Sequence, residues 1–420
     1  MSNPEWSRRD VLKTVGVGAV GLGVGAVALD RMDRYIVGAR DADATLAAAS
    51  VSDTREERID LSKYTGLTLV VGAYSKATRQ SLFSREDVAF VHPDHELSYV
   101  DAPASETPPA SDQQSGEDQQ PSDQVLPWGI DRVDADVAHA EGATGEGVHV
   151  GIVDGGITAS HPDLEANLAD PSVEGNHRAW VECSGDDCEH PWSDDGDHGT
   201  HVAGTVAATE GDSGVVGVAP EATLHALKVC GGAGGCRTSD IAGAIRYAAD
   251  QGWDVVNLSL GGPSESPALQ AAGEYARDSG VVLVAAAGNA GRPDSVGYPA
   301  AYDEFVAVSA TTIDDGIASF SSTGPEVDVA APGESVCSAV VDGHDVLDGT
   351  SMASPHVAGG VAQLLAAGTS PEEVRDRLLD SAEDIGNAED EQGAGLLDVA
   401  AALDYDSDDD GTGDGTGCPA

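Results

Sequence analysis

Basic residues are scarce in this chain, and their scarcity excludes some partners. Lysine and arginine number 21 against 73 aspartates and glutamates, which gives a formal net charge of -52 at pH 7. Nucleic acids and anionic membranes repel such a surface, so neither is expected as a partner. The charge also far exceeds what solubility requires. We interpret it as an adaptation to molar salt, in which screening suppresses the repulsion between like charges.

The chain also lacks a clear membrane-spanning segment. The best candidate is the uncharged, glycine-rich run from Thr14 to Leu29, which is short for a membrane span. It follows the paired residues Arg8 and Arg9, an order that is typical of a twin-arginine export signal. We therefore predict that residues 1–30 are a twin-arginine signal and that the protein is secreted and extracellular. An uncleaved anchor is the alternative.

Cysteine is sparse, with six residues in 420. All of them follow the predicted signal, and an oxidising exterior would favour disulfide formation. Short loops would join Cys183 to Cys188 and Cys230 to Cys236, and we predict these two bonds. Neither pair has the Cys-x-x-Cys spacing of a zinc site, so a structural metal is the weaker interpretation.

Two segments precede the main part of the chain. Residues 35–100 carry strand-like runs at 67–71 and 88–91 and a charged, helix-compatible stretch between them, which indicates a small α+β domain. Residues 101–121 form an acidic, proline-containing linker without basic residues, of the kind that proteases cut.

From residue 122 to residue 403, strand patterns alternate with helical patterns. Apolar, β-branched runs predict buried strands at 148–153, 223–229, 253–258, 281–287 and 305–310, and helical patterns lie at 239–251 and 267–279. This alternation predicts an α/β fold of three layers, with a mostly parallel sheet flanked by helices. Functional sites in such folds lie at the carboxyl ends of the strands.

The last segment, residues 404–420, is an acidic, glycine-rich tail. Asp406, Asp408 and Asp410 match the start of a calcium loop, but Gly417 stands where a bidentate glutamate belongs. A solvated tail is therefore the favoured interpretation.

Ser351 stands at the beginning of a helical pattern. Apolar residues recur after it at Val357, Val361 and Leu364, which places Ser351 at or just before a helix N-terminus. Pro355 is expected in the first turn, where a missing N–H group costs nothing. The unpaired N–H groups at such a terminus stabilise negative charge, which suits a nucleophile. An ordinary N-cap serine is the alternative.

Two other residues suit the same chemistry. Asp154 directly follows the strand at 148–153, and His198 opens a glycine-containing run before an apolar helix. Taken alone, the aspartate would start a turn, and the histidine would be structural or would bind a metal together with His201. The order aspartate, histidine, serine is, however, one of the chain orders known for a Ser-His-Asp triad.

The motifs around Asp154, His198 and Ser351, together with the run Val-Ala-Ala-Ala-Gly-Asn at 284–289, resemble those of the subtilase family. This resemblance covers residues 124–403 and implies a subtilisin-like catalytic domain over residues 122–403. The end of the 35–100 segment resembles the inhibitory propeptide that precedes such enzymes. The charge and the export signal resemble those of halolysin-like proteases from halophilic archaea.

The resemblance implies the chemistry of a serine endopeptidase. Ser351 would be the nucleophile, His198 its general base, and Asp154 the residue that orients the imidazole. Asn289 and the backbone N–H of Ser351 would form the oxyanion hole. As an alternative, Asn289 would be a left-handed turn residue. No cofactor would be required, and activity would rise with pH as His198 loses its proton.

Substrate would lie as an added strand between two edges of the protein, at 231–235 and 258–261 by resemblance. A bond between Cys230 and Cys236 would tie down the first edge. Three glycines would border the pocket for the residue before the cut, and we expect this pocket to favour large apolar side chains. The predicted substrate-binding residues are Gly231, Gly232, Leu258, Ser259, Leu260, Gly261, Gly262, Gly288 and Gly297.

Gln124 and Asp163 match two calcium ligands of the family, and oxygen ligands suit calcium. The loop at 209–215 departs from the family pattern, because Gly211 and Asp212 stand where an asparagine is usual. A structural calcium ion is therefore a prediction that rests on a partial match.

Together these observations predict a secreted, monomeric endopeptidase that is made as a zymogen. Its partners would be protein and peptide substrates and its own propeptide, acting as an intramolecular inhibitor. Self-cleavage near residues 121–124 would release the mature enzyme. Two rival interpretations are a non-catalytic binding scaffold and a protein that cuts only its own propeptide. A scaffold would normally have lost one of the catalytic residues, and all are present here.

Overall fold

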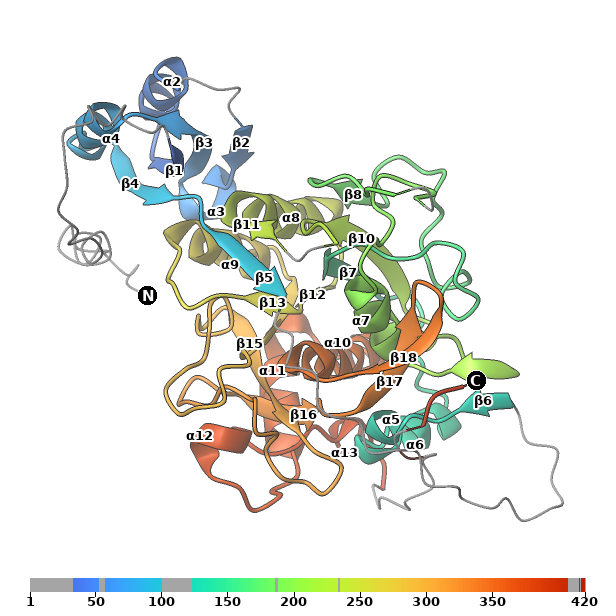
Figure 1. The fold of residues 1–420 in the computed structure, drawn as a ribbon. Helices are drawn as coiled ribbons and strands as arrows, with labels where there is room; N and C mark the ends of the chain where they lie inside the picture. Colours follow the sequence, from blue (N-terminus) through green and yellow to red (C-terminus); the bar gives the residue numbers. More distant parts are fainter. Residues whose placement is uncertain are drawn as a thin grey trace, which may run out of the picture. The chain divides into compact units, whose positions relative to one another are not determined.

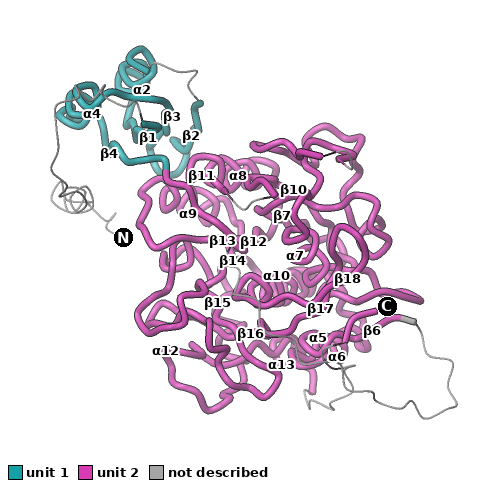
Figure 2. The backbone as a smooth tube through the Cα atoms, in the orientation of Figure 1, with its two compact units in different colours: residues 1–94 teal, residues 95–420 magenta. Residues whose placement is uncertain are grey.

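The computed structural model describes residues 33–52, 57–99, 123–185, 188–232, 235–406, 415 and 417–419. The predicted signal and linker, residues 1–30 and 101–121, lie outside this set. Within the described stretches, no helix is long and apolar enough to cross a membrane. The chain divides into two compact units, residues 1–94 and residues 95–420 (Figure 2).

The first unit is a small α+β domain. Its elements are β1 (Asp33–Ala39), α2 (Ala42–Ser50), β2 (Glu57–Asp60), α3 (Ser62–Thr65), β3 (Thr68–Tyr74), α4 (Lys76–Phe83) and β4 (Val88–Pro93). The strands form one sheet in the order β2-β3-β1-β4 with antiparallel pairing. Val37, Val70 and Leu82 are among its core residues. The unit ends at Asp94, so residues 95–99 lie in the second unit instead of in this domain.

The sequence pattern predicted five strands of the second unit, at 148–153, 223–229, 253–258, 281–287 and 305–310, and each is present. The strands observed there are β5 (Glu96–Tyr99), β6 (Asp123–Val125), β7 (His149–Asp154), β8 (Arg178–Ala179), β9 (Ser213–Val215), β10 (Thr223–Lys228), β11 (Cys236–Arg237), β12 (Val255–Leu258), β13 (Leu260–Gly261), β14 (Val282–Ala286), β15 (Phe305–Thr311), β16 (Val329–Pro332), β17 (Val336–Val340) and β18 (Gly343–Leu347). Seven of them form one sheet in the order β16-β15-β14-β12-β7-β10-β8, and all of its neighbouring strands are parallel.

The helices of the second unit cover both faces of this sheet. They are α5 (Trp128–Arg132), α6 (Ala135–Ala140), α7 (His198–Ala207), α8 (Thr238–Gln251), α9 (Pro267–Asp278), α10 (Thr350–Ala366), α11 (Pro371–Ser381), α12 (Glu389–Gln392) and α13 (Val399–Ala402). Helices α7 and α10 pack against each other and against the strands, as do α8 and α9. The predicted fold, a mostly parallel sheet flanked by helices, is confirmed.

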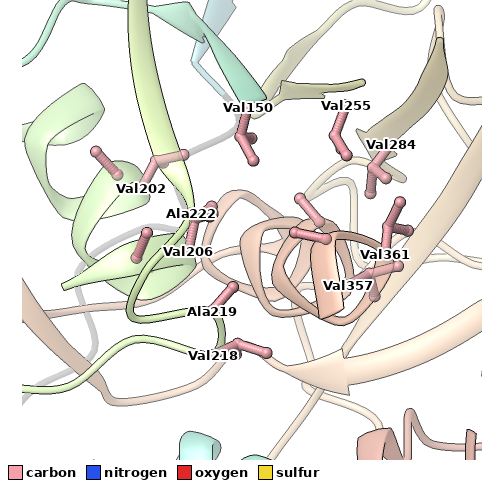
Figure 3. Close-up of a cluster of buried hydrophobic side chains, with 14 of the residues drawn as sticks. Val150, Val202, Val206, Val218, Ala219, Ala222, Val255, Val284, Val357 and Val361 are labelled. Carbon is pink, nitrogen blue, oxygen red and sulfur yellow. The ribbon is translucent and has the colours of Figure 1, made fainter. Parts of the chain in front are cut away.

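Alternate residues of the central strands face the two layers of helices. Val150, Val255 and Val284 lie in one buried cluster with Val357 and Val361 of α10 (Figure 3). The intervening positions are buried as well; Val256 and Leu283, for example, are at most 1% exposed. Because both faces are buried, these strands appear in the sequence as continuous apolar runs.

Three disulfide bonds lie in the second unit. The two predicted bonds, Cys183–Cys188 and Cys230–Cys236, are present. The third joins Cys337 of β17 to Cys418 in the tail, across 81 residues of sequence. The carbonyl oxygen of Gly415 also accepts a hydrogen bond from the N–H of Trp128, at 3.2 Å. The prediction of a solvated tail is therefore wrong for its described end, which the third bond attaches to β17 of the second unit.

The Cys337–Cys418 bond should contribute strongly to stability. Closing so long a loop in the unfolded chain lowers its entropy, which corresponds to about 4.5 kcal/mol in the loop-entropy treatment. We expect Cys337→Ala with Cys418→Ala to lower the free energy of unfolding by about this amount in urea. The matched control is Cys183→Ala with Cys188→Ala, which opens a loop of separation 5 and should cost only about 2 kcal/mol. Equal losses from the two double variants would contradict the prediction.

Candidate active site

Asp154 ends β7, a central strand of the sheet, and is completely buried. Its main-chain oxygen accepts hydrogen bonds from the N–H groups of Val229 and Cys230, at 2.9 and 3.2 Å. Its carboxylate Oδ1 accepts a hydrogen bond from the N–H of Gly155 at 2.6 Å and lies 2.9 Å from His198 Nδ1. Both the main chain and the carboxylate of Asp154 are thus fixed in place.

His198 is the first residue of α7 and is 4% exposed. The carboxylate of Asp154 accepts a hydrogen bond from Nδ1, so in the neutral ring Nε2 is the nitrogen that can accept a proton. His201, one turn later, directs Nε2 to the carbonyl oxygen of Val336 at 2.9 Å. Burial lowers the pKa of His201 to about 3, and the ring is neutral. These bonds do not fit a metal site shared by the two histidines.

Ser351 is the second residue of α10 and is completely buried, which confirms the predicted placement at a helix N-terminus. Its hydroxyl donates a hydrogen bond to the carbonyl oxygen of Ser259 at 3.0 Å. In return, the hydroxyl of Ser259 donates to the carbonyl oxygen of Ser351 at 2.8 Å. Ser259, predicted as a substrate-binding residue, therefore holds the candidate nucleophile from two sides.

Pro355 does not lie in the first turn of α10, as the sequence suggested, but inside the helix. A proline at this position cannot donate a hydrogen bond to the carbonyl oxygen four residues earlier, which belongs to Ser351. That oxygen accepts the bond from Ser259 instead. The proline thus frees the Ser351 carbonyl for a contact outside the helix.

Asn289 follows β14 and lies beside the start of α10. Its Oδ1 accepts hydrogen bonds from both the N–H and the hydroxyl of Thr350, each at 3.0 Å. The Thr350 Oγ1 atom in turn accepts a hydrogen bond from the N–H of Gly288 at 3.0 Å. Because Oδ1 is fixed, the direction of the Asn289 amide group is fixed as well. Thr350 was not predicted from the sequence. Only its position directly before Ser351 could have indicated this role.

Strand β5 lies between β11 and β13 in a three-stranded antiparallel sheet (Figure 1). Glu96 and Leu97 stand opposite residues of β11, and Ser98 and Tyr99 stand opposite Gly261 and Leu260 of β13. An extended segment of this chain is thus bound between two edges. The edge expected at 231–235 is formed in this arrangement by residues 236–237.

The glycines predicted at the first edge lie in different environments. The carbonyl oxygen of Gly231 accepts a hydrogen bond from the hydroxyl of Tyr99 at 3.4 Å. Gly232 packs against the segment before α7, because a Cβ atom there would lie 2.4 Å from the main-chain oxygen of Asp195. Gly231 therefore contacts the bound strand, whereas Gly232 supports the wall behind it.

The three glycines predicted at the pocket before the cut lie close together. A Cβ atom on Gly297 would be 3.2 Å from the carbonyl oxygen of Gly262, and a Cβ atom on Gly288 would be 3.8 Å from the N–H nitrogen of Gly297. Gly262 also exchanges two hydrogen bonds with Tyr298, at 3.0 and 2.8 Å. Leu258 ends β12 and is buried. The walls formed by these glycines carry no side chains.

The predicted calcium ligands, Gln124 and Asp163, form hydrogen bonds with neighbouring groups of the protein. Gln124 Nε2 donates to the carbonyl oxygens of Thr209 and Val215, at 2.9 and 3.1 Å. Asp163 Oδ2 accepts from the N–H of Val215 at 2.9 Å and lies 2.7 Å from His344 Nε2. An N–H donor thus faces the carbonyl oxygens that a cation would need. Among the described residues, no group of three His, Cys, Asp or Glu side chains could hold a metal.

Asp194 is a second buried carboxylate at the site, and the sequence analysis missed it. Its Oδ2 accepts hydrogen bonds from the N–H and the hydroxyl of Thr200 in the first turn of α7, both at 2.8 Å. Burial, with a smaller contribution from the charge of Asp154, raises the pKa of Asp194 to about 6 against the effect of these bonds. Asp194 thus anchors the turn that begins with His198.

The comparisons with known proteins identify the chain as a serine endopeptidase. The chain belongs to the subtilase family, whose sequence model, described as "Subtilase family", matches residues 145–395. Catalysis in this family needs no cofactor.

Three relatives illustrate the similarity. Subtilisin DY of Bacillus licheniformis is 45% identical over 285 residues, which are 66% of this chain and 99% of the relative. Subtilisin E of Bacillus subtilis is 42% identical over 285 residues, 66% of this chain and 71% of the relative. M-protease of Shouchella clausii is 40% identical over 323 residues, 76% of this chain and 77% of the relative.

Proposed function

We propose that this chain is a secreted zymogen whose mature form hydrolyses peptide bonds in proteins and peptides through Ser351, His198 and Asp154. The observation that carries the proposal is the seating of β5 between β11 and β13, with Tyr99 stacked on His198. A peptide segment held in this way presents its main chain to the residues with the required chemistry.

In the proposed mechanism, His198 Nε2 takes the proton of the Ser351 hydroxyl as the oxygen attacks the carbonyl carbon of the substrate. Asp154 keeps the imidazole oriented and stabilises its protonated form. The amide of Asn289 and the N–H of Ser351 donate to the oxyanion. His198 then gives the proton to the leaving amine, which forms the acyl-enzyme. A water molecule, deprotonated by His198, attacks the ester and releases the acid and free Ser351.

The maturation of the zymogen follows from the same arrangement. Residues 1–30 would be a twin-arginine signal, residues 35–100 an inhibitory propeptide, residues 101–121 a linker, residues 122–403 the catalytic domain, and residues 404–420 its tail. Because β5 is held between β11 and β13, we infer that the first self-cleavage falls one residue after its end, between residues 100 and 101. A second cut near residues 121–124 would remove the linker, since β6 begins at residue 123 and pairs with β9. N-terminal sequencing of the intermediate should find a terminus near residue 101, and a single cut at 121–124 would contradict this order.

A fluorophosphonate probe tests the proposed function. The mature enzyme should be labelled stoichiometrically on Ser351 and should hydrolyse casein with repeated turnover. Labelling without casein hydrolysis would indicate a protein that cuts only its own propeptide. No labelling of correctly folded protein would indicate a non-catalytic scaffold, and either result would contradict the proposal.

We further propose that the residue before the cut is a large apolar one. Gly262, Gly288 and Gly297 add no side chains at this position, which would leave space for a large apolar residue of the substrate. Cleavage of a peptide library should enrich large apolar residues at this position, and enrichment of acidic or basic residues would refute the assignment.

The net charge of -52 supports a halophilic, halolysin-like enzyme. In molar salt the Debye length is about 3 Å, and repulsion between the carboxylates is screened. Transfer to dilute buffer should therefore unfold or inactivate the enzyme, as circular dichroism and casein hydrolysis would record. Full activity in dilute buffer would remove this inference.

A structural calcium ion at Gln124 and Asp163 stays a prediction from the resemblance to the family. It requires the Gln124 amide to turn, so that Oε1 replaces Nε2 beside the carbonyl oxygens of Thr209 and Val215. Calcium added to chelator-treated enzyme should then raise its melting temperature, and an unchanged temperature would exclude the site.

A further inference from the structure

The side chain of Tyr99 occupies a subsite beside the catalytic histidine. Its ring lies on the imidazole of His198, with ring centroids 4.2 Å apart and planes inclined by 18°. Its hydroxyl donates to the carbonyl oxygen of Gly231 at 3.4 Å. The ring thus has a stacking partner on its face and a hydrogen-bond acceptor at its tip, which is the combination that suits tyrosine.

Gly155 makes room for the end of the Tyr99 ring. A Cβ atom at residue 155 would lie 2.1 Å from Tyr99 Oη and 3.2 Å from Cζ, while its next neighbour, Asp194 Oδ1, would be 3.3 Å away. Gly155 does not adopt a positive φ angle, so its backbone does not demand glycine. The bound tyrosine hydroxyl is therefore the main obstacle to a side chain at this position.

The walls of the subsite cannot easily move aside. The N–H of Gly155 donates to Asp154 Oδ1 at 2.6 Å, and its carbonyl oxygen accepts from the buried ammonium of Lys228. The imidazole of His198 is held by Asp154 at 2.9 Å. Gly231 follows Cys230, whose N–H donates to the main-chain oxygen of Asp154. Because the residues around the subsite are held in place, a methyl group at residue 155 would clash with the bound tyrosine side chain instead of displacing its neighbours.

The pairing of β5 with β13 identifies the substrate position. Ser98 stands opposite Gly261 and Tyr99 opposite Leu260. In this register, the next residue of any extended peptide comes opposite Ser259, whose carbonyl oxygen accepts from the Ser351 hydroxyl at 3.0 Å. That next residue presents its carbonyl group to the nucleophile. The subsite therefore receives the side chain of the second residue before the scissile bond.

We propose that the enzyme prefers tyrosine at the second residue before the scissile bond, and that Gly155 determines this preference. The inference rests on the proposed peptidase function and adds a specificity to it. Stacking and burial of the ring should raise kcat/KM about ten-fold over alanine at the same position. Phenylalanine should be accepted nearly as well as tyrosine, because the bond from the hydroxyl to Gly231 is long.

The test compares three quenched peptides, Glu-Leu-Ser-X-Val-Asp-Ala-Pro, in which X is tyrosine, phenylalanine or alanine. Mature enzyme from the full chain should cut each peptide after valine, as mass spectrometry would record, and should prefer tyrosine to alanine about ten-fold. The Gly155→Ala variant should lower the ratio of kcat/KM for tyrosine over phenylalanine by about ten-fold or more, because the new methyl group meets the hydroxyl.

Phenylalanine is the matched control within each enzyme. A variant that is merely less stable or less active would lose activity on both aromatic peptides and leave their ratio unchanged. An unchanged ratio, equal rates for tyrosine and alanine in the wild type, or a cut directly after tyrosine would each overturn the inference and leave the peptidase function intact. If none of the peptides and no casein were cleaved, the proposed function would fail and the inference with it.

Discussion

Replacing Ser351 by alanine should abolish peptide hydrolysis. The change removes the hydroxyl that donates to Ser259 and leaves the contacts between Asn289 and Thr350 in place. We expect kcat to fall by about a million-fold, which is the scale of loss when the corresponding serine is removed from subtilisin. The precursor should accumulate, because self-cleavage depends on the same oxygen. Casein hydrolysis and electrophoresis of the secreted protein measure the two effects.

A second serine on the same helix provides the control. Ser354 lies one turn further along α10, and its Oγ is 3.0 Å from Ser259 Oγ. Ser354→Ala removes one buried hydrogen bond, which costs about 1 kcal/mol of stability, and should retain activity far above that of Ser351→Ala. A purified Ser351→Ala precursor that still trims itself would disprove the assignment of the nucleophile.

Replacing Asp154 by asparagine should cost about ten-thousand-fold in kcat. Asp154 Oδ1 accepts the hydrogen bond from His198 Nδ1 at 2.9 Å inside a completely buried site. An asparagine amide at this place can donate to Nδ1 and so favours the wrong tautomer of the imidazole. It also cannot stabilise the imidazolium that forms when Ser351 is deprotonated. Steady-state kinetics on the same peptide should show the loss in kcat.

Asp197→Asn is the matched control for this change. Asp197 is adjacent to His198, is exposed, and bonds through its carboxylate to the N–H of Val341 at 3.0 Å. The substitution removes the same charge next to the same histidine, and asparagine tolerates the positive φ of 67° at this position. Its kcat should stay within a few-fold of the wild type, because exposed charges interact weakly. If the two variants lost activity equally, net charge and not orientation would explain the effect.

Much of the catalytic unit could be predicted because its signals are local. The runs at 148–153 and 305–310 correspond to β7 and β15 within one residue at each end. Strands buried on both faces are apolar at every position, so they stand out without knowledge of their neighbours. The short cysteine loops could be predicted for the same reason, since little chain separates their ends.

The error at Pro355 has a different origin. The sequence indicates a helix and a proline near its start, but not that the helix begins at Thr350 or that Ser259 supplies a hydrogen bond to Ser351. A proline inside a helix is tolerated only when the carbonyl group that it leaves unpaired finds another partner. That partner lies 92 residues away in the sequence.

The sequence by itself determined the fold class and the family, because both are indicated by apolar runs and short motifs whose own residues are close along the chain. The order of aspartate, histidine and serine follows directly from the positions of those motifs. Only the tertiary structure decided that β5 lies between β11 and β13, that Thr350 fixes Asn289, and that Cys337 pairs with Cys418. These contacts join residues dozens to more than a hundred positions apart. No periodicity or spacing encodes such pairs, because they form only when the packed sheet and helices bring them within hydrogen-bond or covalent distance.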